Sequence, residues 1–281
     1  MTTVVAAFVL GLVPAVVVWT LTRAVFSHPT LARRNVRGID VPTAGGVVIV
    51  VALLPGWMLA DLLLVHTDDV VSYHLAASFG IVTVTAVFAF LGIVDDVLAS
   101  GPERGFRGHL GALFHGRFTT GGLKLVGGGL VALVLAAGAG SLWEVVVDGA
   151  VIALAANTAN LFDRAPGRVT KVSSLALVLL LATASGGERH QLAMVALVVG
   201  AAAGLLVAEL REQVMLGDTG ANPLGAVIGL GLVTVCGTVV TVAVLAVLVA
   251  LNVASEKVSF SEVIDRTPPL RWLDQLGRAP E

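Results

Sequence analysis

Charged side chains are what this sequence has least of. Asp, Glu, Lys and Arg make up 13% of its 281 residues, about half the roughly 25% of a typical soluble domain. Apolar residues reach 57%, and the mean hydropathy is +0.95. Because so few charges cannot cover the surface of a water-soluble globule, the composition excludes a soluble enzyme and a disordered chain. The formal net charge of −2 also excludes nucleic acid as a partner.

Cysteine and aromatic residues are scarce as well. The single cysteine, Cys236, excludes an internal disulfide and a thiolate metal cluster. Aromatic residues contribute 5% of the chain, whereas glycine contributes 32 residues. Small residues let membrane helices approach each other closely. This composition is therefore typical of a polytopic helical membrane protein.

Long apolar runs fill most of the chain. A bilayer core of about 30 Å needs roughly 20 apolar residues per helix. We predict an all-α bundle of about nine transmembrane helices, with ten as the alternative count and with the sixth and eighth spans short. The predicted spans are 3–26, 43–65, 74–94, 119–139, 145–162, 172–186, 190–210, 221–235 and 237–253.

The distribution of Lys and Arg predicts the orientation of the bundle. If the N-terminus lies outside, the loops at 27–42, 95–118, 163–171, 211–220 and 254–281 face the cytoplasm. Sixteen of the 17 basic residues then lie on or near that side, and only Arg189 lies opposite. This asymmetry follows the positive-inside rule. We expect a multi-pass protein of the cytoplasmic membrane whose C-terminus and functional side face the cytoplasm.

Polar residues gather at helix ends on this same side. Each group has a plainer interpretation, because carboxylates can end or cap a helix, amides can join helices and arginines can set topology. Ionisable groups near membrane depth are costly, however, and four groups on one side favour a site. Carboxylates and amides suit a hard divalent cation, and arginines with glycine-rich turns suit phosphate. The four segments are RRNVRGIDVPTAGG at 33–46, FLGIVDD at 90–96, NTANLFD at 157–163 and LGDTGAN at 216–222.

In this order the segments resemble the motifs of the polyprenyl-phosphate N-acetylhexosamine-1-phosphate transferase superfamily. This superfamily is also called glycosyltransferase family 4 and includes the phospho-N-acetylmuramoyl-pentapeptide transferase. VPTAGG at 41–46 is similar to its PT-x-GG motif, and GIVDD at 92–96 to its G-x-x-DD motif. NTANLFD at 157–163 resembles the first half of N-x-x-N-x-x-D-G-x-D-G, and GDTGA at 217–221 resembles GD-x-G-S/A.

The resemblance implies an enzyme that uses Mg²⁺ to transfer a sugar-1-phosphate from a UDP-sugar to polyprenyl (undecaprenyl) phosphate. UMP is released, and the product initiates a cell-envelope glycan. The implied partners are the UDP-sugar, the lipid acceptor and membrane lipids, with a homodimer left open. Asp218 and Asp95 are then the metal ligands, and Asp95, Asp96 and Lys124 are the catalytic residues. The implied substrate-binding residues are Thr43, Asn157, Asn160, Asp163, Arg164, Arg168 and Asn222.

Three features depart from the family pattern. Pro166 stands where the second aspartate of DG-x-DG is expected, between two arginines. No histidine follows His190, so the late histidine motif is missing; His109 and His115 are candidate substitutes or solvated loop residues. The chain also has about one helix fewer than the usual ten. These departures leave open a non-catalytic lipid-phosphate or nucleotide-sugar binding homologue that regulates envelope synthesis. A transporter is disfavoured by the lack of charge at mid-span.

For the last segment, 254–281, we predict a short amphipathic helix on the inner membrane surface. Ser259 and Glu262 have the spacing of a capping box, and a proline pair at 268–269 interrupts the pattern. We expect this helix to pack against the protein and not to act as a lid. The chain thus divides into a transmembrane transferase domain, 1–253, and a cytoplasmic amphipathic tail, 254–281.

Overall fold

The computed structural model describes residues 1–64, 68–98, 111, 115–116, 119–138, 140–185 and 188–278, with the backbone alone for 64 and 68–77. The all-α prediction is confirmed over these residues, and each of the nine predicted spans corresponds to one long helix. The long helices are α1 (Thr2–Thr22), α2 (Gly46–Leu64), α3 (Asp68–Leu98), α5 (Thr120–Ala136), α6 (Leu142–Phe162), α7 (Arg168–Thr183), α8 (Ala193–Leu210), α9 (Asp218–Val235) and α10 (Thr238–Ser255).

Short elements join and follow these helices. The segment between α1 and α2 holds an antiparallel pair of strands, β1 (Ala32–Arg34) and β2 (Asp40–Pro42). The C-terminal segment forms two helices, α11 (Phe260–Arg266) and α12 (Pro268–Gln275). The prolines therefore begin a second helix, as proline favours the first helical position. The remaining elements are the 3₁₀ turns Val25–Ser27, Pro29–Leu31 and Arg189–Leu192.

Among the residues that the structure describes, six helices are long and apolar enough to cross a bilayer. They are α1, α2, α3, α6, α8 and α10. α5 is apolar but has 17 residues, and α7 has 16. Only 6% of α10 is buried inside the molecule, so most of its apolar surface needs a non-aqueous environment. The helices have the character expected of a membrane protein.

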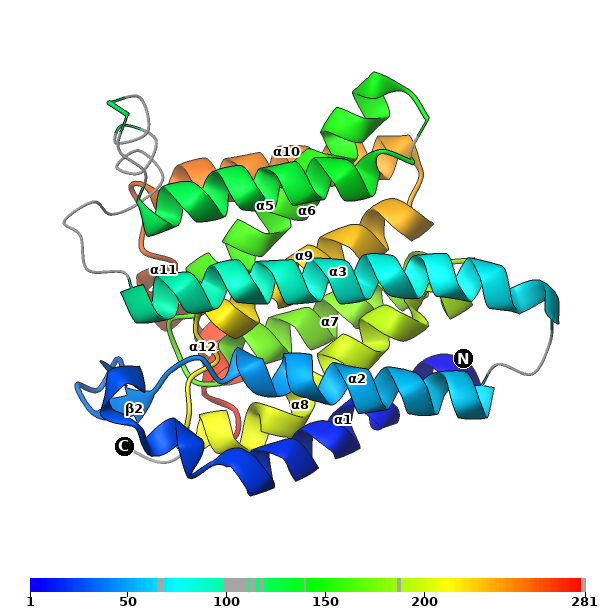
Figure 1. The fold of residues 1–281 in the computed structure, drawn as a ribbon. Helices are drawn as coiled ribbons and strands as arrows, with labels where there is room; N and C mark the ends of the chain where they lie inside the picture. The colour runs from blue at the N-terminus through cyan, green and yellow to red at the C-terminus, as the bar shows by residue number, and fades with distance from the viewer. Residues whose placement is uncertain are drawn as a thin grey trace.

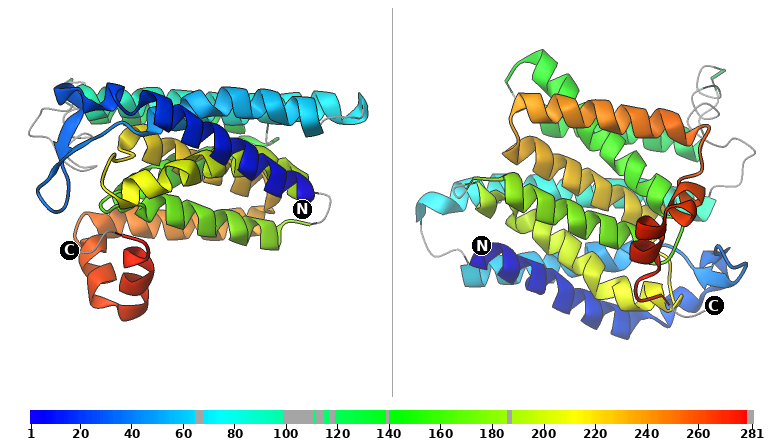
Figure 2. Two further views of the ribbon diagram at one scale, coloured as in Figure 1. Left: turned by 90° about the horizontal axis from the view of Figure 1, so that it is seen from below. Right: turned by 180° about the vertical axis from the view of Figure 1, so that it is seen from behind.

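The bundle is built around α8 and α9. Figure 1 shows the long helices lying side by side with roughly aligned axes, and α8 packs on α1 while α9 packs on α3 and α6. The left view in Figure 2, seen from below, shows α11 and α12 projecting from one end of this bundle. Large buried side chains such as Ile49, Leu197 and Leu224 fill the contacts between helices. The core of the described residues is thus formed by helices packed on helices.

Two motif glycines bring helix backbones into direct contact at the start of α9. A Cβ atom on Gly46 would lie 2.2 Å from the backbone nitrogen of Gly220, and one on Gly92 would lie 2.3 Å from the backbone oxygen of Asp218. Neither position can therefore hold a larger residue without separating the helices. The first turn of α9 is wedged between α2 and α3, and this packing sets Asp218 beside the end of α3.

Candidate active site

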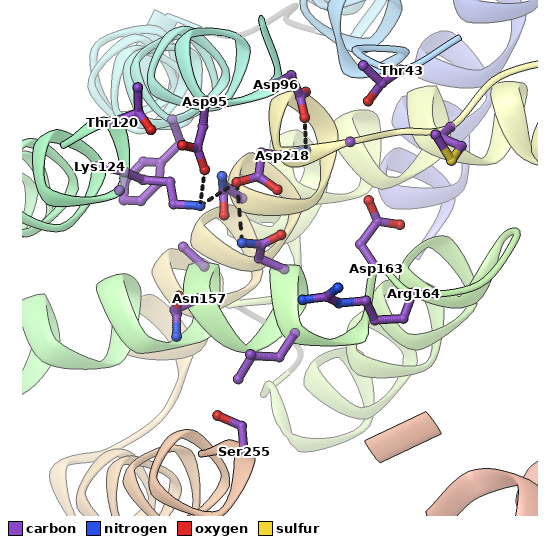
Figure 3. A pocket seen from close by; sticks show the side chains of 18 of the residues that line it. Thr43, Asp95, Asp96, Thr120, Lys124, Asn157, Asp163, Arg164, Asp218 and Ser255 are labelled. Atoms are coloured by element: carbon purple, nitrogen blue, oxygen red, sulfur yellow. Dashed lines mark hydrogen bonds and ion pairs between the residues drawn. The ribbon is translucent and has the colours of Figure 1, made fainter. Parts of the chain in front are cut away.

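A cavity of about 1740 Å³ opens at one end of the bundle, where α3, α6, α8 and α10 end and where α2, α5 and α9 begin. This volume exceeds the roughly 300–1000 Å³ of a typical small-molecule pocket, so it has room for two substrates. The structure brings ten of the eleven predicted site residues to its wall (Figure 3). They are Thr43, Asp95, Asp96, Lys124, Asn157, Asn160, Asp163, Arg164, Asp218 and Asn222, and Figure 3 labels all of them except Asn160 and Asn222.

The centre of the cavity is a cluster of charges around Lys124. The Lys124 Nζ lies 3.2 Å from Asp95 Oδ2 and also forms an ion pair with Asp218. Figure 3 shows these three side chains pointing toward one another from α5, α3 and α9. In the amide orientation that satisfies both neighbours, Asn160 Nδ2 donates to Asp218 Oδ1 at 2.6 Å and its oxygen accepts from Lys124 Nζ at 3.0 Å. Four helices therefore supply one hydrogen-bonded cluster.

Lys124 offers this cluster a positive charge for an anion, and Asp95 and Asp218 offer it carboxylate oxygens of the kind that a divalent cation prefers. Its three charged side chains are 16–20% exposed, so water screens their charges weakly. Among the described residues, no group of three or more His, Cys, Asp and Glu side chains is arranged to hold a metal. Mg²⁺ needs only one or two protein carboxylates, however, when phosphate and water complete its coordination. Asp95 and Asp218 fit that smaller requirement.

Asp96 faces away from this cluster and caps α9. Its Oδ1 accepts from the Asp218 backbone nitrogen at 3.1 Å, and its Oδ2 accepts from the Thr219 nitrogen at 3.0 Å and from the Thr219 hydroxyl at 2.6 Å. Gly217, with φ +65°, leaves room for the contact, since a Cβ there would lie 2.5 Å from both Asp96 Oδ2 and Thr43 Oγ1. Asp96 therefore satisfies amide groups that a helix N-terminus leaves open.

The amide side chains divide into two kinds. Asn157 Nδ2 donates to Asn252 Oδ1 at 2.5 Å, which joins α6 to α10. Asn252 in turn donates to the Thr158 hydroxyl at 2.8 Å. Asn222, by contrast, is 1% exposed, and its Nδ2 has no partner among the described residues. An unpaired buried donor is costly, so the Asn222 amide is suited to a ligand oxygen.

The turn after α6 carries Asp163 and Arg164 into the cavity (Figure 3). Burial raises the pKa of Asp163 well above its ordinary 3.8, and the negative charges of Glu209 and Asp218 raise it further. Glu209 is buried at the end of α8 and accepts a hydrogen bond from the Thr170 hydroxyl at 3.0 Å. Asp163 therefore adds to the cavity wall a carboxyl group whose ionised form is disfavoured by burial and by neighbouring negative charges.

Arg168 is the one predicted site residue that the structure places outside the described cavity wall. Its buried guanidinium bonds Asp274 and Ser261 in the C-terminal helices. His115 is exposed, contacts the Gly111 carbonyl, and does not line the cavity. His109 lies outside the described residues.

Sequence reasoning missed several residues of the cavity wall. Glu209 and Asn252 are single polar residues at the ends of apolar runs. That position alone is a functional signal near a membrane, although neither residue belongs to a recognisable spacing pattern. The end of α10 and the residues after it, 255–257, also line the cavity.

Comparison with known proteins agrees with this geometry. The family model described as "Glycosyl transferase family 4" matches residues 78–237, more than half of the chain. The chain belongs to glycosyl transferase family 4. No curated protein matches the chain with significance.

Family membership confirms the resemblance to the polyprenyl-phosphate hexosamine-1-phosphate transferases. Members of this family are glycosyltransferases that in general use a sugar-phosphate donor and a lipid-phosphate acceptor, and the long apolar helices of this chain are those of a membrane protein. The matched range contains all four residues of the Lys124 cluster. The VPTAGG motif at 41–46, Asn252 and the C-terminal helices lie outside it.

Proposed function

We propose that this family 4 member catalyses Mg²⁺-dependent transfer of a sugar-1-phosphate from a UDP-sugar to polyprenyl phosphate, with release of UMP. The observation that carries the proposal is the cluster of Lys124, Asp95 and Asp218 inside one large cavity. The Lys124 ammonium group lies between the carboxylates of Asp95 and Asp218. This arrangement suits a reaction in which two anionic substrates must meet. The product would be the lipid-linked sugar that initiates a cell-envelope glycan.

We assign the part of the cavity wall next to Lys124 to the lipid acceptor. Along α5 the lining continues from Lys124 to Leu125, Gly128 and Gly129, and Phe88 of α3 lies against Gly128. This part of the wall is apolar. We infer that the acceptor phosphate lies at Lys124 while the first isoprene units follow α5 toward the bilayer.

We assign the opposite part of the cavity wall to the nucleotide donor. Asn160 contacts Asp218 and Lys124 directly, and the unpaired Asn222 amide lies one turn farther along α9. Arg164 adds a positive charge from the turn after α6. Together these groups offer donors and a cation to the diphosphate and to the polar groups of the nucleotide.

In the proposed reaction an oxygen of the lipid phosphate attacks the β-phosphorus of the UDP-sugar. A new P–O bond forms, the bond from the β-phosphorus to the bridging oxygen breaks, and UMP leaves with that oxygen. No proton is transferred when the acceptor is a dianion. Lys124 orients the acceptor phosphate and offsets its charge, and Asp96 holds the start of α9 so that Asp218 keeps its position. Mg²⁺ bound by Asp218 and Asp95 would neutralise the donor diphosphate.

We further propose that all nine long helices span the cytoplasmic membrane, with the N-terminus outside and the cavity facing the cytoplasm. The cavity lies at the bundle end that carries Arg33, Arg34, Lys124, Arg164 and Lys257. Because basic residues favour the cytoplasmic side, the site would face the compartment that supplies nucleotide sugars.

The test is a donor screen with purified protein, undecaprenyl phosphate and Mg²⁺, in which UMP release is measured for a panel of UDP-sugars. We expect one donor class to support release, and Asp218→Asn and Lys124→Met to lower the rate by about 10²-fold or more. Asp61→Asn is the matched control, because Asp61 is exposed near the far end of α2. Release that persists undiminished in Asp218→Asn would overturn the metal assignment.

A non-catalytic binding homologue is the second candidate. Pro166 in place of an acidic residue, beside Arg164, favours it, because the exchange removes a carboxylate from the cavity wall. Its signature would be saturable nucleotide-sugar binding without UMP release from any donor in the presence of Mg²⁺ and lipid acceptor.

A further inference from the structure

The helices α11 and α12 are attached to the bundle mainly through polar contacts. In α12 the one buried side chain is that of Asp274, whereas Leu270, Trp272 and Leu273 are 44–64% exposed. Phe260 of α11 stacks on Phe162 at the end of α6, with ring centroids 5.3 Å apart. This ring stack is an apolar contact. Because the apolar side chains of α12 are exposed, however, an apolar core does not explain how this pair of helices is held in place.

Asp274 is the centre of the attachment. Arg168 binds it with two parallel hydrogen bonds, from Nε to Oδ1 at 2.7 Å and from Nη2 to Oδ2 at 2.9 Å. Arg278 Nη2 lies 2.6 Å from the same Oδ2. The third nitrogen of Arg168 donates to the Ser261 hydroxyl at 2.9 Å. Bidentate arginine–carboxylate pairs are strong and directional, so this network fixes an orientation as well as a contact.

The same network holds the turn between α6 and α7. Arg278 Nε donates to the Pro166 carbonyl at 3.3 Å, and Arg168 is the first residue of α7. The turn at 163–167 is short, with the Arg164 nitrogen donating to the Phe162 carbonyl at 2.7 Å and Gly167 at φ +69°. Its two anchors to the C-terminal helices thus lie at Pro166 and Arg168, next to the residues that face the cavity.

We propose that Asp274 is a positioning residue for the active site, because through Arg168 and Arg278 it fixes the turn that presents Asp163 and Arg164 to the cavity. The residues at 255–257 line the cavity and lead directly into α11, so the same attachment holds two parts of the wall. The expected effect on turnover rests on the proposed function. The effect on the turn itself does not.

The physical reason is the burial of the charges. The Arg168 and Asp274 side chains are each 5% exposed, and Arg278 is 16% exposed. Removing the carboxylate would leave two poorly solvated guanidinium groups without their counter-ion, which is far costlier than losing an exposed pair. These groups would then separate and seek water, and the turn would lose both anchors.

The test compares Asp274→Asn with Glu262→Gln in the full-length protein. Glu262 pairs with Arg266 on the exposed face of α11, so this control removes the same charge from the same segment without touching the turn. Amide hydrogen exchange over 163–171 and the KM for the UDP-sugar are measured for both. We expect Asp274→Asn to raise exchange in the turn and the donor KM about tenfold each, with a smaller change in kcat, and Asp274→Glu to recover part of both.

If Asp274→Asn does not fold, Arg278→Gln replaces it, since this change removes the bond to Pro166 and leaves the Arg168–Asp274 pair. Unchanged exchange in the turn, or an equal rise in Glu262→Gln, would overturn the proposal. So would a loosened turn with an unaltered KM in an active protein. If the wild type releases no UMP, the proposed function fails, and exchange together with nucleotide-sugar binding still decides the role of Asp274.

Discussion

Asp96, the last acidic residue of α3, caps α9 through Thr219. Its carboxylate accepts hydrogen bonds from both the backbone nitrogen and the hydroxyl of Thr219, at 3.0 and 2.6 Å. The adjacent Asp95 points the other way, to Lys124. Successive helical residues differ by about 100° in direction. The two carboxylates of one motif therefore have separate tasks: one holds the helix that carries Asp218, and the other joins the charge cluster.

We predict that Asp96→Ala destabilises the protein while Asp95→Ala mainly lowers activity. Asp96→Ala removes three hydrogen bonds to a charged acceptor, which corresponds to about 2–4 kcal/mol. Asp96→Asn keeps one acceptor oxygen and should fall between. Thermal unfolding in detergent, measured beside UMP release, separates the two effects. Equal midpoints for Asp96→Ala and the wild type would contradict the capping role.

Gly92 offers a test of the contact between α3 and α9. Alanine there would put Cβ 2.3 Å from the backbone oxygen of Asp218, so the two helices must separate. We expect a lower unfolding midpoint and at least a tenfold loss of UMP release. Gly80→Ala on the same helix is the control, since its nearest neighbour would be the Leu230 Cδ2 at 3.8 Å. If both variants behave alike, the close approach does not matter for the site.

The Asp274 network predicts a specific pH dependence of stability. Burial raises the pKa of Asp274, but the hydrogen bonds and charges of Arg168 and Arg278 outweigh it and hold the pKa below the ordinary 3.8. A lowered folded-state pKa stabilises the protein above the unfolded value, and this stability disappears as pH falls through the folded value. Asp274→Asn should therefore be about 3–5 kcal/mol less stable at pH 7.

This difference between Asp274→Asn and the wild type should shrink as pH drops below about 4. Unfolding midpoints of both proteins from pH 7 to pH 3 measure it. A gap that stays constant over this range would mean that the carboxylate charge is not what stabilises the C-terminal helices.

Cysteine labelling tests the proposed orientation. Cys236 follows α9 at the end of the bundle away from the cavity, and it can be replaced by alanine to provide a cysteine-free background. Gly138, where a Cβ meets no atom within 4 Å, and the exposed Val258 then provide single sites at opposite ends. We expect a membrane-impermeant maleimide to label Gly138→Cys on intact cells and Val258→Cys only after lysis. The reverse pattern would contradict the orientation.

The helices were predictable because their signal is local. Each apolar run of bilayer length indicates a helix by itself, and the nine predicted ranges each overlap one long helix. The first helix ends at Thr22, four residues before the predicted limit, because the chain then turns through Val25–Ser27 and His28 adopts the extended conformation favoured before proline. The expected break at the proline pair is confirmed, because α11 ends at Arg266 and Pro268 begins the separate helix α12.

Site residues that belong to a sequence motif could be predicted, whereas site residues that stand alone in the sequence could not. Motif spacing indicated the residues that the structure gathers around the cavity. The partner of Arg168, by contrast, lies 106 positions along the chain, and that of Asn157 lies 95 positions along. No local pattern marks either pair, because each depends on how distant helices pack. The different directions of Asp95 and Asp96 likewise became visible only with the packing of α9.

A donor labelled with ³²P at the β-phosphate tests most directly whether a phosphorylated sugar moves to the lipid. With undecaprenyl phosphate and Mg²⁺, we predict that the label enters the lipid fraction while unlabelled UMP is released in equal amount, and that Asp218→Asn abolishes both. Label that stays in the aqueous phase as UDP while sugar enters the lipid, or label that never leaves the donor for any UDP-sugar, would contradict the account.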